Sequence, residues 1–225
     1  MFERLAAIVP AYNAATHLEN VIASIKRHIP AGNIIVVDDA STDETYSAAA
    51  RSDVVVIRHE LNRGKGGAIR TAIAHLPTLP SIDAVIMLDA DGQHDPDEIP
   101  RFAKEFMKGD FDLIIGNRMA GRGEMPALRV LTNRLTSAVI SMRAGQRVPD
   151  SQNGYRLVRA ALLMRLDLVT YRYEIDSEII IKACRAGARV SSIPVRTIYG
   201  SQKSAIRPIH DTARFIALVM RSFFW

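Results

Sequence analysis

The chain of 225 residues has one cysteine, Cys184, and lacks any uncharged apolar run of about 18 residues. A lone cysteine excludes an internal disulfide and a multi-cysteine metal site, so we expect Cys184 to be a buried small hydrophobe rather than a nucleophile. The apolar runs are too short for a transmembrane helix, and residues 1–4 lead into a strand without the features of a signal peptide. These absences predict a cytoplasmic protein.

Acidic residues are scarce in the second half of the chain. Residues 1–112 carry 11 Lys and Arg against 17 Asp and Glu, whereas residues 113–225 carry 18 against 7. Between Glu124 and Asp150 there are four arginines and no acid. The imbalance favours an anionic partner, either nucleic acid, a phosphorylated substrate or an acidic lipid surface, over a merely solvated basic face. No recognisable nucleic-acid-binding module supports the first of these partners, so we expect the protein not to bind nucleic acid.

Short apolar runs alternate with helix-like segments as far as residue 118. The runs cover residues 5–9, 34–37, 54–57, 84–88 and 113–116. This order predicts an α/β fold, a mostly parallel sheet flanked by helices. The length suits a single domain over 1–225, with halves at 1–118 and 119–225.

The second half is less regular. We predict helices over 127–143, 175–186 and from Arg207 to the end, and strands over 154–158 and 189–195. Apolar residues recur at helical spacing in the first of these helices: Leu128, Leu131, Leu135, Val139 and Met142. The last helix is basic and amphipathic, with arginines at 207, 214 and 221. These two helices either lie on a membrane or pack into the core.

Polar groups follow several of the predicted strands, at Pro10 to Asn13, Asp38-Asp39, Asp89 to Asp91 and Arg118. The carboxyl ends of parallel strands meet at one edge of a sheet, where open α/β sheets bind their ligands. We therefore expect these four strand ends to converge on one site.

Five carboxylates crowd residues 89–98. Three of them suit a helix start, namely Asp95, Asp97 and Glu98. Asp89 and Asp91 are left, with Gln93 or His94 nearby, and their oxygens suit Mg²⁺ or Mn²⁺ more than a solvated turn. Because Mg²⁺ is held by one or two carboxylates and substrate phosphates, the pair indicates a phosphorylated substrate. His94 is expected to be a hydrogen-bonding loop residue rather than a ligand.

Other candidate groups leave two interpretations open. Asp38 could accept hydrogen bonds from a ribose or base, or could cap a turn toward Asp43. The segment 64–67, Gly-Lys-Gly-Gly, lacks the Walker spacing and is expected to be a glycine-rich helix start. The cations Arg118 and Lys203 could neutralise a leaving diphosphate or could be surface charges.

Six motifs occur in one order along the chain: VPAYN (9–13), VVDDAS (36–41), NxGxG (62–66), DADGQH (89–94), GNR (116–118) and NGYR (153–156). In this order they resemble family 2 glycosyltransferases of the GT-A fold, a Rossmann-like architecture. The resemblance covers essentially the whole chain and is greatest for the dolichyl-phosphate mannose synthase and polyprenyl-phosphate glycosyltransferase branch.

The resemblance implies a role for each matching residue. Those expected at the donor nucleotide are Pro10, Tyr12, Asn13, Val37, Asp38, Asp39, Ala90 and Gln93. Asp89, Asp91 and Gln93 would hold the metal and the diphosphate, with Arg118 and Lys203 facing the phosphates. Those expected at the acceptor are Arg129, Arg134, Asn153, Tyr155 and Arg156.

Three departures from the family pattern matter. Ala14 stands where Glu is common, Thr197 where Arg is common, with Arg196 beside it, and no tandem hydrophobic spans follow the catalytic region. The first weakens any inference about a base, and the second weakens a further phosphate contact.

The resemblance implies an inverting, metal-dependent transfer of a sugar from a GDP- or UDP-sugar to a polyprenyl phosphate, by an enzyme peripheral on the cytosolic membrane face. The alternative is transfer to a sugar or protein hydroxyl, which requires a general base. Candidate bases are Asp150, Glu174, Asp176 and Glu178, each of which is expected to be a cap or a surface charge. A non-catalytic nucleotide-sugar-binding protein is a third possibility.

Overall fold

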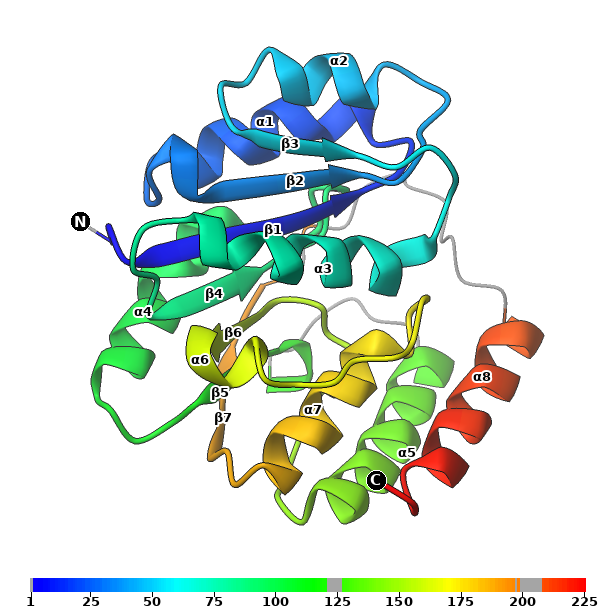
Figure 1. Cartoon of the computed structure of the whole chain (residues 1–225). Helices are drawn as coiled ribbons and strands as arrows, with labels where there is room; N and C mark the ends of the chain where they lie inside the picture. The colour runs from blue at the N-terminus through cyan, green and yellow to red at the C-terminus, as the bar shows by residue number, and fades with distance from the viewer. Residues whose placement is uncertain (1, 121–126, 197, 199–207) are drawn as a thin grey trace.

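A seven-stranded sheet runs through the computed structural model, which describes residues 2–120, 127–196, 198 and 208–225 (Figure 1). Its strands are β1 (Leu5–Ala11), β2 (Ile34–Asp38), β3 (Val55–Arg58), β4 (Ala84–Met87), β5 (Leu113–Asn117), β6 (Arg156–Arg159) and β7 (Val190–Pro194). They lie in the order β3-β2-β1-β4-β6-β5-β7. The predicted strands are therefore all present, with ends shifted by one or two residues.

The sheet is mostly parallel, as predicted. β3, β2, β1 and β4 pair in parallel, and β6 pairs antiparallel with both β4 and β5, so β5 keeps the direction of β4. β7 then pairs parallel with β5. All strands except β6 consequently end on the same rim, and this rim carries the polar segments singled out in the sequence.

Helices cover both faces of the sheet (Figure 1). They are α1 (Ala15–Lys26), α2 (Thr45–Ala50), α3 (Gly64–His75), α4 (Ile99–Met107), α5 (Ala127–Ala144), α6 (Ala160–Leu163), α7 (Ile175–Arg185) and α8 (Pro208–Arg221), with short 3-10 turns at Ala31–Asn33, Leu76–Thr78, Pro96–Glu98 and Arg118–Ala120. One core cluster contains residues of α1, α2 and α4, and the other contains residues of α3, α5, α6 and α7. The two clusters take alternate residues of β1, because successive strand side chains point to opposite faces.

The helix α3 begins at Gly64, so the glycine-rich segment is a helix start as predicted. Asp95 accepts the backbone N–H of Asp97 at 3.0 Å, which confirms its capping role. The short helix α6 was not predicted, and the start expected at Arg207 lies outside the described residues.

Three residues of the predicted apolar stripe of α5 do not face the core. Leu131, Leu135 and Met142 are 54%, 61% and 73% exposed, whereas Asn133 and Ser137 are buried. Packing into the core is therefore wrong as an interpretation for these three residues, although Val139 is half-buried and α5 contacts the core through Ile140 and Ala144. The described parts of the chain contain no helix whose length and apolar character would let it cross a membrane.

Candidate active site

The loop after β4 presents Asp89 at the rim of the sheet. Its Oδ1 lies 2.8 Å from the ammonium of Lys65, and 31% of its side chain is exposed. Burial alone would raise the pKa of Asp89, but the charge and hydrogen bond of Lys65, together with electrostatic interactions with His94 and Arg156, outweigh burial and hold this pKa at about 2. Asp89 is thus a carboxylate at neutral pH that one cation already accompanies.

The buried ring of His94 stabilises this loop. Its Nδ1 accepts the backbone N–H of Asp89 at 3.0 Å, and its ring stacks on Tyr155 with centroids 5.1 Å apart. Burial lowers the pKa of His94, which agrees with a neutral ring that accepts at Nδ1. The prediction that His94 is a hydrogen-bonding loop residue is confirmed.

Asp91 and Gln93 form the other side of the loop. The backbone N–H of Gln93 donates to Asp91 Oδ1 at 2.9 Å, across Gly92, whose φ of +77° favours glycine. The described residues contain no group of three acidic, histidine or cysteine side chains that could enclose a metal alone. Two carboxylates with an open side fit a Mg²⁺ or Mn²⁺ ion that substrate phosphates complete.

Behind Asp89, a buried ion network joins the two halves of the chain. Lys65 Nζ also lies 3.0 Å from Asp176 Oδ2, and Arg156 Nη2 lies 3.1 Å from Asp176 Oδ1. Burial disfavours charge on Lys65, yet Asp176 and Asp89 together raise its pKa. Arg156 is fully buried, and its Nη1 donates to the backbone carbonyl of Asp176.

Arg118, at the end of β5, is held by Asp150. Its Nε and Nη2 donate to the two carboxylate oxygens at 2.8 and 2.9 Å, and Asn133 adds a bond of 2.8 Å. Burial would raise the pKa of Asp150, but the Arg118 guanidinium lowers it. The expectation of a surface charge or cap is therefore wrong for Asp150, which is fully buried.

Asp176 and Glu178 are also buried, contrary to that expectation. Glu178 accepts the backbone N–H groups of Val169 and Thr170, each at 2.9 Å, and pairs with Lys182 at 2.7 Å. The first turn of α7 therefore carries two carboxylates that are bound in the interior. Apart from Lys182, which lies one turn further along α7, the partners of these acids lie on other segments, so no local pattern marks the acids as buried.

At the ends of β2 and β3, Asp39 anchors the start of α3. Its two oxygens accept the backbone N–H groups of Arg63 and Gly64 at 2.8 and 2.7 Å, and His59 Nδ1 lies 2.7 Å from Oδ1. Asp38 accepts the backbone N–H of Ser41 at 3.1 Å, which is the turn interpretation. Neither carboxylate is exposed by more than 2%.

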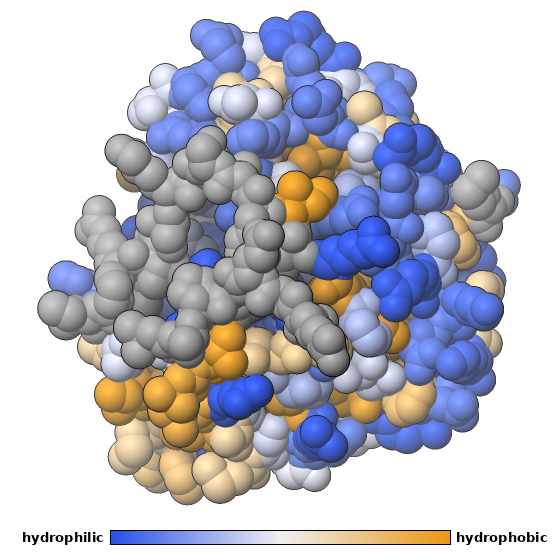
Figure 2. Space-filling model, turned by 180° about the vertical axis from the view of Figure 1, so that it is seen from behind, coloured by the Kyte–Doolittle hydropathy of each residue, from blue (hydrophilic) through white to orange (hydrophobic). Residues whose placement is uncertain are grey.

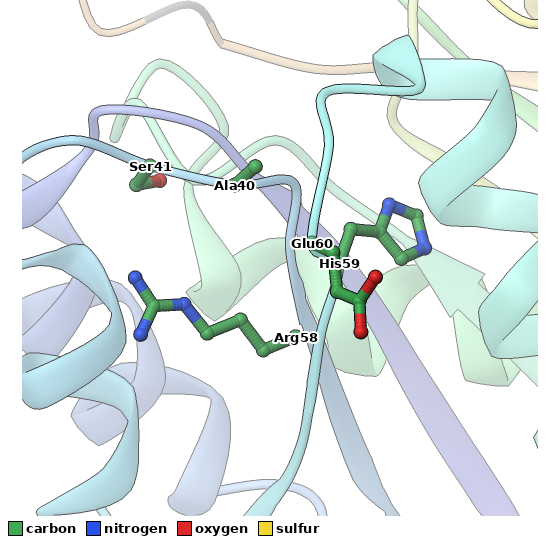
Figure 3. Close-up of a pocket in the computed structure, with 5 residues that line it drawn as sticks. All are labelled: Ala40, Ser41, Arg58, His59 and Glu60. Carbon is green, nitrogen blue, oxygen red and sulfur yellow. The ribbon is translucent and has the colours of Figure 1, made fainter.

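A pocket of about 490 Å³ opens beside these two aspartates. Its lining comes from Ala40, Ser41, Arg58, His59 and Glu60 (Figure 3). Figure 3 shows Arg58 and His59 pointing to opposite sides of their strand, with the Ser41 loop beside them. The Arg58 guanidinium carbon lies 4.6 Å from the centre of the Tyr46 ring.

The remaining predicted donor residues lie at or beside the same rim. Tyr12 is 52% exposed at the end of β1, while Val37 and Ala90 are buried and Pro10 is half-buried. The Asn13 side-chain oxygen accepts the backbone N–H of Thr42 at 2.9 Å. Lys203 lies outside the described residues.

The predicted acceptor residues fall into two groups. Asn153, Tyr155 and Arg156 are fully buried; Tyr155 donates its hydroxyl to the carbonyl of Asp95 at 2.9 Å, and Asn153 donates to that of Gly116 at 2.7 Å. Arg129 and Arg134 instead lie exposed on α5. In this structure only the second group is open to solvent.

Sequence reasoning missed Lys65. The glycines around it were the available signal, since a side chain on Gly66 would lie 2.6 Å from the carbonyl oxygen of Thr170. Such close approach brings the start of α3 against the segment before α7, and it directs Lys65 to Asp89 and Asp176.

The model of the glycosyl transferase family 2 matches residues 6–167, so the chain belongs to this family. It is an enzyme of the glycosyltransferase class. An uncharacterized protein of Methanocaldococcus jannaschii, MJ1222, is 36% identical over 203 residues, which are 88% of this chain and 82% of that protein. The UDP-N-acetylglucosamine–dolichyl-phosphate N-acetylglucosaminyltransferase of Methanococcus voltae is 31% identical, covering 85% and 84%.

Among solved structures, glucosyl-3-phosphoglycerate synthase from Mycobacterium tuberculosis in complex with Mg²⁺ and UDP superposes with a TM-score of 0.73. At 20% identity it covers 98% of this chain and 79% of that one. This likeness shows the fold, the GT-A type that the motif order implied.

Proposed function

We propose that the protein transfers a sugar from a nucleoside-diphosphate sugar to a polyprenyl phosphate at a membrane surface, with a divalent cation at Asp89 and Asp91. Relatives named for polyprenyl-phosphate transfer support the acceptor, among them the Methanococcus voltae enzyme. A GDP- or UDP-sugar donor and the cytosolic face of the membrane stay predictions from the sequence.

One observation carries the choice of acceptor. Of the four late carboxylates that could serve as a general base, Asp150, Asp176 and Glu178 are buried and paired with cations. The pKa values of Asp150 and Glu178 are lowered, which weakens them as bases, although burial works in the opposite direction. A hydroxyl acceptor needs such a base, whereas a phosphate is already anionic near neutral pH.

The proposed binding of the donor and the metal is supported by a difference in exposure among the carboxylates at the rim of the sheet. Asp38 and Asp39 are enclosed and bound to backbone N–H groups, while Asp89 and Asp91 are partly exposed. A cation held there supplies Lewis-acid stabilisation of the departing diphosphate. The pocket beside Ser41 and Arg58 lies on the same rim and gives the nucleoside a place to bind.

An exposed apolar surface supports a lipid acceptor. It comprises Leu131, Leu135 and Met142 of α5, Ile216 and Met220 of α8, and Phe223 and Phe224 beyond it, each more than half exposed. Figure 2 shows apolar side chains gathered at the lower left, the side where Figure 1 turned by 180° places α5 and α8. Exposed Arg129 and Arg134 on α5 and Arg221 on α8 would meet lipid phosphates.

In the proposed reaction the acceptor phosphate oxygen attacks the anomeric carbon as the nucleoside diphosphate leaves from the opposite side. Arg129 and Arg134 would bind the lipid phosphate. Lys65 and His94 keep the Asp89 loop in place, and Lys203 is expected to face the leaving phosphates.

The test is to incubate the protein with Mg²⁺ or Mn²⁺, polyprenyl phosphate and a panel of GDP- and UDP-sugars, and to detect glycosylated lipid by mass spectrometry. Matched reactions contain polyprenol without phosphate, or free sugars as hydroxyl acceptors. We expect product only with the phosphate, and none in excess chelator. Transfer to the hydroxyl acceptors alone would favour the alternative, and turnover in chelator would contradict the metal.

A further inference from the structure

The ammonium of Lys65 is fixed by the backbone around it. Gly66 packs so tightly that a Cβ there would lie 2.6 Å from the carbonyl oxygen of Thr170, and Gly67 donates its N–H to the carbonyl of Tyr171 at 3.2 Å. These contacts hold the start of α3 against the segment before α7. Lys65 leaves this start as the second residue of the helix.

The side-chain partners of Lys65 fix its other end. Nζ lies between Asp89 Oδ1 at 2.8 Å and Asp176 Oδ2 at 3.0 Å, with only 12% of the side chain exposed. A Cβ on Gly154 would lie 2.6 Å from Nζ and 3.1 Å from Asp89 Oδ2, so this glycine closes a third side. The position of the positive charge is thus set by three separate segments.

The fixed positive charge of Lys65 weakens the attraction of the Asp89 carboxylate for a metal ion. A divalent cation that binds Asp89 must approach an ammonium that already shares the carboxylate, and the fully buried Arg156 adds a second positive charge behind Asp176. Repulsion between cations is poorly screened in a partly buried site. The negative diphosphate of the donor would offset it.

Building on the proposed function, we infer that Lys65 is a positioning residue that makes binding of the divalent cation depend on the donor's diphosphate. The free enzyme then holds the metal weakly, and metal and nucleotide bind together. Because Lys65 acts through Asp89, its effect is visible in metal binding without any turnover.

The experiment measures Mn²⁺ binding by electron paramagnetic resonance, with Mn²⁺ alone and with Mn²⁺ plus UDP or GDP. For the wild type we expect the nucleotide to tighten Mn²⁺ binding about tenfold or more. Lys65→Met should bind Mn²⁺ alone about tenfold more tightly than the wild type, and should respond less to the nucleotide. Lys65→Arg, which keeps the charge, should behave as the wild type.

Lys65→Met leaves two carboxylates facing Arg156, so a second variant keeps the local net charge unchanged. Lys65→Met with Asp176→Asn removes one charge of each sign and still frees Asp89. Because Arg156 then loses its ion-pair partner, the melting temperature of each variant is measured beside that of the wild type. Tight Mn²⁺ binding by this double variant supports the inference, and binding like the wild type, or weaker, overturns it. Asp91→Asn separates the two proposals: if it binds Mn²⁺ and nucleotide normally, the metal site itself is misplaced, whatever Lys65 does.

Discussion

The two halves of the molecule differ in their exposed apolar residues and in the burial of several of their ion pairs. In the first half the ion pairs Arg4–Asp83 and Arg51–Glu19 are about half or more exposed, and the strands bury apolar residues. In the second half Glu178 and Arg156 are fully buried in ion pairs, while leucines and phenylalanines of the α5 and α8 region face outward.

This difference indicates which environment, water or lipid, the surface of each half suits. A group of exposed apolar residues is unfavourable in water and suits a lipid surface, and the first half has fewer large apolar residues exposed. Buried pairs hold one geometry because loss of either partner leaves an uncompensated charge. The first half therefore offers an accessible acidic loop, and the second half offers buried ion pairs beneath an apolar face.

The largest effect is expected from Asp91→Asn. It removes one proposed metal ligand from a partly exposed loop of the first half, so turnover should fall about 100- to 1000-fold. The melting temperature should stay within about 2 °C of the wild type, because the change is at a loop surface. Glycolipid formation by mass spectrometry and differential scanning calorimetry measure both. Full turnover in excess chelator would defeat the metal mechanism.

Asp150→Asn should show the opposite pattern, a loss of stability in the second half. The change leaves Arg118 without its buried carboxylate, which costs about 3 kcal/mol. A loss of this size lowers the melting temperature by roughly 6 to 12 °C in a chain of this length. Calorimetry of the two variants side by side is the check, and equal melting temperatures would remove the contrast between the halves.

Lowering the pH should also weaken the ion pair between Asp150 and Arg118. The folded-state pKa of Asp150 lies below its unfolded value because the hydrogen bonds from Arg118 and Asn133, together with the charge of Arg118, outweigh burial. Its contribution to stability is therefore present above about pH 4 and is lost as the pH falls through the folded pKa. Between pH 7 and pH 3 the melting temperature of Asp150→Asn should fall less than that of the wild type.

A smaller effect is expected from the exposed face of α5. The double variant Leu131→Ser and Leu135→Ser should reduce binding to anionic vesicles about tenfold or more, because each leucine loses the gain from apolar burial. Co-sedimentation with the vesicles measures this. Leu61→Ser is the matched control, since Leu61 is 77% exposed in the first half. An equal loss with Leu61→Ser would show that the apolar face has no special part in binding.

Local patterns in the sequence were sufficient for the sheet and its rim. Alternating apolar runs predicted β1 to β5, and the strand ends carried Asp89, Asp91 and Arg118 to the same edge. The partners of the buried charges could not be predicted in this way. Lys65 and Asp176 are 111 residues apart, and no periodicity links them. The spacing of Leu131 and Leu135 indicated a stripe on α5 but did not indicate which side faced the core.

The smallest effect is expected from Asp83→Asn, and it completes the contrast. Asp83 pairs with Arg4 at 2.6 Å, shorter than the ion pairs that Lys65 and Arg156 make in the buried network, but the two side chains are 48% and 63% exposed. Water screens such a pair, so its removal should cost no more than about 0.5 kcal/mol. The melting temperature should move by less than about 2 °C, against the much larger shift for Asp150→Asn. If both variants lost the same stability, the distance between the charges, rather than their burial, would determine the strength of these pairs.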